Sequence, residues 1–182
     1  MKFILLRHAE TLSNKANRAD SQIDSELTKK GLEDARSLVP KLKKFKIDLI
    51  VVSPLRRNVQ TLQPFLDTLN DPKIVVNELI LERNLGDFTG TPMGTFQKYC
   101  DDHHYDKIFH RPKNGESIAD TYERSKKFLA TLKAQFPNHN KVLICGHKNF
   151  LMCLEILVRG LEIGDFANHT PLKNAEFRVI EA

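Results

Sequence analysis

The sequence has few cysteines, no tryptophan and no long apolar run. Its three cysteines, Cys100, Cys145 and Cys153, are an odd number and include no Cys-x-x-Cys pair, so neither a disulfide framework nor a zinc finger is expected. No stretch approaches the roughly 20 consecutive apolar residues of a membrane helix. The short apolar run after Met1 also lacks the length of a signal-peptide core. These absences predict a protein without a membrane segment in a reducing, cytoplasmic setting.

Repeats, low-complexity tracts and Gly/Ser-rich linkers are absent as well, so the sequence offers no boundary between domains. Its 182 residues, 41% hydrophobic and 28% charged, suit a single domain spanning residues 1–182. The 28 Lys and Arg residues outnumber the 23 Asp and Glu residues, which gives a formal net charge of +5. This charge favours anionic ligands but is too small to resemble a histone or a ribosomal tail. We therefore expect phosphate-bearing ligands, no nucleic-acid partner and no membrane partner; the sequence leaves the oligomeric state open.

What the sequence does contain is a recurring order of a short apolar run, a polar corner and a helical pattern. Nearly continuous apolar runs are typical of strands that are buried on both faces. The runs occupy residues 3–6, 47–52, 74–76 continuing into 79–81, 142–145 and 177–180. Strands that alternate with helices predict an α/β fold: a three-layer sandwich with a mostly parallel central sheet flanked by helices.

Helix starts can be located from capping residues. A helix is expected over about 28–44, with a kink or an early end at Pro40. Another should start at Ser53-Pro54, because serine is a favoured N-cap and proline a favoured first helical residue. The segment 117–120 resembles a capping box that opens a long helix. The region of about 89–115 is less periodic and richer in Gly, Pro and His, so we expect a lid or insertion beside a site.

Polar side chains directly follow the apolar runs, where the carboxyl ends of parallel strands meet at one edge of a sheet. They are Arg7-His8-Ala9-Glu10-Thr11, Ser53-Pro54-Leu55-Arg56-Arg57, Glu82-Arg83-Asn84 and Gly146-His147-Lys148-Asn149. Arginine forks suit phosphoryl oxygens, a neutral imidazole can act as a nucleophile, and a carboxyl group can donate a proton to the leaving group. No spacing fits a two-metal phosphatase, so the positive charge has to come from side chains. The pattern predicts phosphoryl transfer with no metal and no cofactor.

Six segments in order along nearly the whole chain resemble the motifs of the histidine phosphatase superfamily, the group of cofactor-dependent phosphoglycerate mutases and many phosphatases. They are Leu6-Arg7-His8-Ala9-Glu10-Thr11 with Asn14, Asp24 to Gly31, Ser53 to Thr61, Leu81-Glu82-Arg83 with Gly86 to Gly90, Gly115-Glu116-Ser117, and Gly146-His147. The order and number of these matches make the resemblance specific.

The resemblance implies three catalytic residues. His8 would be the nucleophile that forms a phosphohistidine, and Glu82 would give a proton to the leaving oxygen. His147 would help to hold the phosphoryl group and would serve best when protonated, whereas His8 must present an unprotonated nitrogen. Their surroundings should therefore separate the two pKa values.

The resemblance also implies substrate-binding residues. Arg7 and Arg57 would hold the phosphoryl oxygens, and Asn14 would complete the pocket. For Arg57, the motif register favours it over its neighbour Arg56, which is expected to lie on the surface. Asn14 has the structural alternative of capping a turn.

Three residues depart from the family pattern: Ala9 replaces a commoner glycine, Thr89 a common glutamate, and Lys148 the usual glycine after the second histidine. The chain also lacks the long insertion that mutases carry between the Glu82 region and the Gly115 turn. The prediction is a metal-independent phosphomonoester hydrolase that acts through His8 on a small-molecule or protein-borne substrate. The alternatives are a phosphotransferase of the phosphoglycerate mutase type and a phospholigand-binding protein without turnover.

Overall fold

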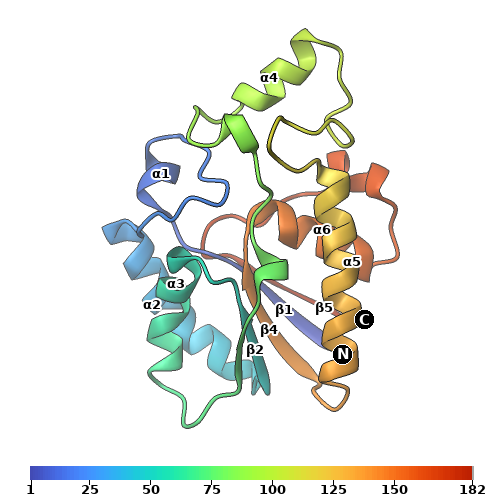
Figure 1. Ribbon diagram of the computed structural model, residues 1–182. Coiled ribbons are helices and arrows are strands. Elements are labelled where there is room, and N and C mark those ends of the chain that lie inside the picture. The colour runs from blue at the N-terminus through green and yellow to red at the C-terminus, as the bar shows by residue number, and fades with distance from the viewer. Residues whose placement is uncertain (182) are drawn as a thin grey trace.

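The structure is a computed structural model that describes residues 1–181, in which five strands form one sheet (Figure 1). The strands are β1 (Lys2–Arg7), β2 (Leu49–Val52), β3 (Ile74–Val76), β4 (Lys141–Gly146) and β5 (Phe177–Glu181). Their order across the sheet is β3-β2-β4-β1-β5. The first four strands run parallel, and only β5 runs antiparallel, against β1. The predicted mostly parallel central sheet is confirmed.

Helices cover both faces of the sheet. The α-helices are α1 (Leu12–Lys15), α2 (Lys29–Leu42), α3 (Arg56–Leu66), α4 (Thr95–Asp102), α5 (Ile118–Gln135) and α6 (Lys148–Val158). Short 3₁₀ helices occupy Lys43–Phe45, Glu78–Ile80, Gly86–Phe88 and Ile163–Asn168. In Figure 1, α2 and α3 lie on one side of the sheet and α5 and α6 on the other, which confirms three layers. Within residues 1–181, none of the helices has the length and hydrophobicity needed to cross a membrane.

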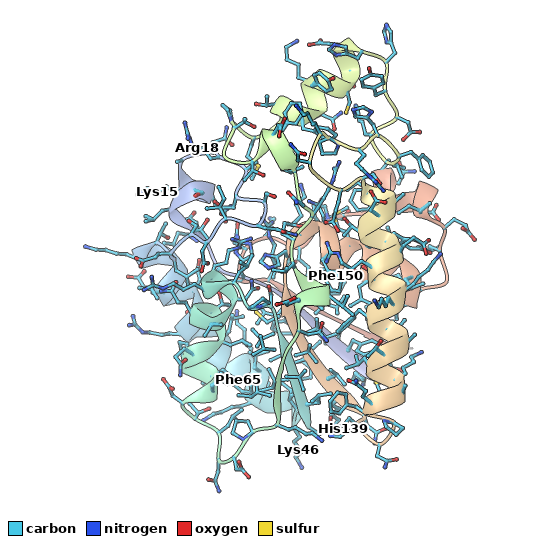
Figure 2. All side chains as sticks on the ribbon, in the orientation of Figure 1. Lys15, Arg18, Lys46, Phe65, His139 and Phe150 are labelled. Carbon is cyan, nitrogen blue, oxygen red and sulfur yellow. The ribbon has the colours of Figure 1, made fainter. Side chains whose placement is uncertain are left out.

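The two faces of each central strand contribute to two separate cores, because successive side chains of a strand point in opposite directions. From β1, Phe3 and Leu5 pack toward α5 and α6, whereas Ile4 and Leu6 pack toward α2 and α3. Figure 2 labels one large side chain of each core, Phe150 of α6 and Phe65 of α3. This burial on both faces explains why the central strands are nearly continuous apolar runs.

The capping residues correctly predicted the starts of α2 and α5 but not the start of α3. Thr28 caps α2, where its side chain accepts a hydrogen bond from Gly31 N, and Ser117 forms the predicted capping box with Asp120 at the start of α5. The helix predicted to start at Ser53-Pro54 instead begins at Arg56. The Ser53 hydroxyl does not cap it, because this hydroxyl is buried and bonds the ring of His147.

Two further predictions concern local structure. The early end that was the alternative to a kink at Pro40 does not occur, because α2 continues to Leu42 before a 3₁₀ helix follows. The apolar residues 79–81 do not extend β3, since they lie in and after the 3₁₀ helix Glu78–Ile80. Side-chain bonds from α5, described below, hold this segment away from the sheet.

The region 89–115 contains α4 and lies at the top of the molecule in Figure 1, beyond the carboxyl ends of the parallel strands. Gly86 and Gly115 join it to the rest of the chain through a close backbone crossing. Gly86 has a φ of 52°, and a Cβ there would collide with the carbonyl oxygen of Lys113. Both glycines are therefore required by the packing of this crossing, while the role of 89–115 as a lid stays a prediction.

Candidate active site

The register of the sheet brings the two predicted histidines together. Arg7 of β1 pairs with Gly146 of β4, so the residues that follow, His8 and His147, emerge side by side. Their ring centroids are 5.3 Å apart. The carboxyl edge of the parallel strands is thus the place where the two histidines meet.

A small cavity of about 100 Å³ opens at this edge. Five of the six predicted site residues line it, namely Arg7, His8, Asn14, Arg57 and Glu82. His147, which is fully buried, touches His8 and Arg57 from beneath and is not part of the cavity wall. The structure therefore brings all six residues to one place but only five of them to the cavity surface.

His8 is held in one tautomer by its surroundings. Its Nδ1 lies 2.9 Å from the carbonyl oxygen of Ala9, and because a carbonyl only accepts, Nδ1 must carry the proton. Nε2 is then unprotonated, and it makes no hydrogen bond within residues 1–181. Burial, reinforced by the positive charges of Arg57 and Arg7, lowers the pKa of His8 to about 3. The ring therefore stays neutral at physiological pH with a lone pair on Nε2.

The two arginines supply positive charge and unused donors at the cavity. Arg7 donates through one terminal nitrogen to the carbonyl oxygen of Leu172 at 2.9 Å, while its buried Nε has no partner within residues 1–181. Arg57 is 1% exposed and donates to the carbonyl oxygens of Ser21 (2.8 Å) and Ile23 (2.6 Å). A buried guanidinium with unused N–H groups is costly unless an acceptor binds, so the cavity suits an anion with several oxygens.

His147 does not have the protonation expected from the sequence. Its Nδ1 lies 3.3 Å from Nε of Arg57, and an arginine can only donate, so Nδ1 accepts and is unprotonated. Its Nε2 lies 2.9 Å from the Ser53 hydroxyl. Burial, together with the charge of Arg57, lowers the pKa of His147 well below its ordinary value. Both histidines are therefore neutral, because burial and the nearby arginines lower the pKa of each ring.

The two neutral histidines make the stability of the fold sensitive to acid. Their folded-state pKa values lie below the value of about 6.5 in an unfolded chain, so the unfolded state binds more protons as the pH falls below 6.5. Between pH 7 and pH 5 each ring should cost about 2 kcal/mol of unfolding free energy. Urea unfolding at the two pH values measures this loss, which should be smaller by one such step in His147→Gln. An equal loss in the wild type and the variant would contradict the assignment.

Glu82, which also lines the cavity, is positioned by backbone donors. Its Oε1 accepts hydrogen bonds from the backbone N–H of Arg83 (2.8 Å) and of Asn149 (3.2 Å), whereas Oε2 has only a longer contact of 3.4 Å to Asn149 N. Oε2 is therefore the oxygen with more capacity to carry a proton. Arg124 of α5 fixes the segment itself by donating to the carbonyl oxygens of Leu79 and Leu81, each at 2.8 Å.

Asn14 combines the two roles considered for it. Its side chain completes the capping box of α1 with Thr11, and it also lines the cavity. Asn174, near the C-terminus, donates to Asn14 Oδ1 at 3.1 Å and to the carbonyl oxygen of His8 at 3.0 Å. Asn174 lies in no recognised motif, and neither its role nor the structural roles of Arg124 and the Asn149 backbone could be predicted from a local sequence pattern.

The predicted absence of a metal site can be compared with the placement of potential ligands. Within residues 1–181, no three His, Cys, Asp or Glu side chains converge as ligands of a metal ion would. Cationic side chains, by contrast, meet at the cavity. The arrangement can bind a small anion, present an imidazole nitrogen to it and place a carboxyl group across from that nitrogen.

Comparison with known sequences agrees with this arrangement. The sequence profile of the histidine phosphatase superfamily (branch 1) matches residues 3–182. The chain belongs to this superfamily. As a member of the histidine phosphatase superfamily, it has relatives that carry both phosphatase and mutase names, so membership alone leaves the reaction open between hydrolysis and transfer.

Two curated relatives illustrate this division. Phosphoserine phosphatase 1 of Hydrogenobacter thermophilus is 26% identical over 186 residues, which cover 99% of this chain and 86% of that protein. A phosphoglycerate mutase of Schizosaccharomyces pombe is 30% identical over 168 residues, covering 87% of this chain and 79% of the mutase. Both names fall within the family that the motifs indicated.

Solved structures confirm the fold. A mycobacterial glucosyl-3-phosphoglycerate phosphatase superimposes with a TM-score of 0.87 at 24% identity, covering 99% of this chain and 90% of that chain. The alpha-ribazole phosphatase of Shigella flexneri gives a TM-score of 0.85 at 22% identity, covering all of this chain and 90% of that chain. The three-layer α/β architecture of the histidine phosphatases is therefore shared over the full length.

Proposed function

We propose that the protein hydrolyses phosphomonoesters through a phosphohistidine formed on His8. The observation that carries this proposal is the fixed tautomer of His8, whose unprotonated Nε2 faces a cavity lined by Arg7 and Arg57. An anion at these arginines would present its phosphorus to that nitrogen. Positioning and charge stabilisation are what phosphoryl transfer chiefly requires from a protein.

The reaction would take place in two steps. In the first, Nε2 of His8 forms a bond to phosphorus, the ester P–O bond breaks, and Glu82 gives its proton to the departing oxygen. In the second, water attacks phosphorus, the P–N bond breaks, and Glu82 takes a proton from the water. Inorganic phosphate leaves, and both residues return to their starting states.

The remaining residues would bind and orient the phosphoryl group. Arg7 and Arg57, which both line the cavity, would offer N–H groups to its oxygens, and the amide of Asn14 would lie at the edge of the same cavity. His147 would act from beneath by fixing Arg57, and a bound phosphoryl dianion would raise its pKa toward the protonated form that the sequence analysis expected. This charge comes from side chains and requires no metal or other cofactor.

Hydrolysis is preferred to mutase activity because of the space beside the cavity, described below, which exceeds the needs of a three-carbon acid. Retention of His8, Glu82 and both arginines in one cavity argues against a binding protein without turnover. We further propose a small-molecule substrate and a cytoplasmic enzyme, with residues 1–182 acting as one domain.

The decisive experiment follows the phosphoryl group. The wild-type protein is mixed with a ³²P-labelled aryl phosphate, quenched in alkaline detergent, and analysed for base-stable, acid-labile phosphate on the peptide that contains His8. We expect transient labelling followed by release of inorganic phosphate, and no isomerisation of a phosphoglycerate. Isomerisation faster than phosphate release would favour the mutase alternative, and phosphate release without any labelled histidine would exclude the covalent route.

A further inference from the structure

A second cavity of about 540 Å³ adjoins the small one. Six residues line both cavities, so the larger space opens directly onto the reacting group; they are Ala19, Arg83, Leu85, Met93, Lys148 and Asn149. Pockets of roughly 300–1,000 Å³ are typical of sites for organic ligands of drug-like size. The volume is thus suited to a leaving group considerably larger than a three-carbon acid.

The wall of the larger cavity is mainly apolar. Its apolar lining residues include Phe88 of the 3₁₀ helix Gly86–Phe88, Phe96 of α4, Ile118 at the start of α5 and Met152 of α6. An apolar wall of this kind stabilises an apolar ligand by removing its surface from water. The leaving group should therefore have an apolar or aromatic body.

The charged side chains that line the larger cavity are the cations Arg83, Lys107 and Lys148. Arg83 and Lys148 stand where it meets the phosphate cavity, and no acidic residue is among the described residues that line the larger space. Lys148 is exposed and has no ion-pair partner within residues 1–181. This sign of charge favours a leaving group that carries an anion of its own.

Arg83 is the most informative of these residues because it is 5% exposed and incompletely bonded. Its guanidinium is fixed by a 2.7 Å hydrogen bond from Nε to the carbonyl oxygen of Glu116 and lies 4.7 Å above the ring of Phe96. Within residues 1–181, its buried terminal nitrogen NH2 has no acceptor. A buried donor without an acceptor costs about 1–3 kcal/mol, and a ligand oxygen at this point would remove that cost.

The following inference rests on the phosphatase activity proposed above. It names the substrate class of that same site. We infer that the substrate is a phosphomonoester whose leaving group combines an apolar or aromatic body with a carboxylate, and that Arg83 selects the carboxylate. Arginine forms paired hydrogen bonds with carboxylates. Lys148 adds long-range attraction from the rim.

The test compares kcat/KM for phenyl phosphate with the values for 3-carboxyphenyl and 4-carboxyphenyl phosphate, and for the small aliphatic ester 2-carboxyethyl phosphate. The wild type should prefer at least one carboxyphenyl ester to each of the other two. In Arg83→Met, kcat/KM for the preferred ester should fall about 10- to 100-fold, with phenyl phosphate changed by less than about threefold. Arg83→Lys should recover part of the loss, and Arg56→Met, an exposed arginine outside both cavities, should resemble the wild type.

The outcomes separate the two proposals. An equal fall on charged and uncharged esters would show a structural role for Arg83 and overturn its assignment to specificity. No preference for carboxyphenyl esters in an active wild type would overturn the substrate class while leaving the phosphatase proposal in place. If no ester is hydrolysed, the phosphatase proposal fails, and calorimetric binding of 3- and 4-hydroxybenzoate to the wild type and Arg83→Met decides the cavity assignment alone: tighter binding by the wild type supports it, and equal binding contradicts it.

Discussion

Replacing His8 by alanine is expected to lower phosphate release by about 10³- to 10⁶-fold, the range found when a covalent nucleophile is removed from an enzyme. The reason is that, among residues 1–181, His8 is the histidine that lines the cavity, whereas His147 is not part of its wall and has both ring nitrogens bonded. The arginines remain, so the variant should still bind inorganic phosphate or a phosphate ester. Steady-state phosphate release and calorimetric binding measure these two properties separately.

His139→Ala is the matched control for this variant. Figure 2 shows His139 at the end of the molecule opposite α4, far from the carboxyl edge of the sheet. Its replacement should leave phosphate release within about twofold of the wild type, as is usual for surface changes away from a site. If His8→Ala released phosphate as fast as His139→Ala, His8 would not be the nucleophile.

Glu82→Gln should produce the second large effect, with a dependence on the leaving group that identifies the proton donor. In single-turnover measurements with an alkyl phosphate, phosphorylation of His8 should slow by about 10²- to 10⁴-fold, the usual contribution of general acid catalysis. With an aryl phosphate whose phenolate leaves without protonation, the rate should stay near that of the wild type. Rapid-quench measurement of labelled protein gives both rates.

Glu78→Gln serves as the control, because Glu78 is exposed in the 3₁₀ helix that precedes the site and lines neither cavity. It should change neither rate. An equal slowing of both esters in Glu82→Gln would mean that Glu82 positions other groups and does not donate the proton.

Sequence reasoning located the strands and most of the site because burial and chemistry leave strong local signals. A strand buried on both faces must be apolar throughout, and the residue after it must turn at the sheet edge, so His8 and His147 could be placed together. The sequence does not show which of these side chains reach the surface of the cavity. That His147 lies beneath the surface depends on Arg57 and Ser53, which reach it from a neighbouring strand and helix.

The wrong predictions for the start of α3 and for residues 79–81 have the same cause. In each case a side chain forms hydrogen bonds with a part of the chain that is distant in sequence. Ser53 has the chemistry of an N-cap, but its hydroxyl bonds His147, and the N-cap of α3 is Leu55, two residues later. Residues 79–81 have the composition of a strand, but Arg124 draws their carbonyl oxygens away from the sheet. Long-range bonds of this kind leave no periodicity that a local pattern could reveal.

The bonds of Asn174 have a consequence for how the protein is made. His8 lies near the start of the chain, yet its backbone is completed by Gly146, Asn174 and Ala175, and its neighbour Arg7 is held by Leu172. His8 is therefore synthesised long before Gly146, Asn174 and Ala175, which complete its backbone hydrogen bonds. Contacts so distant in sequence form slowly. The candidate site should consequently form only once residues 172–175 are present, and chains that end before Leu172 should have no assembled cavity at His8.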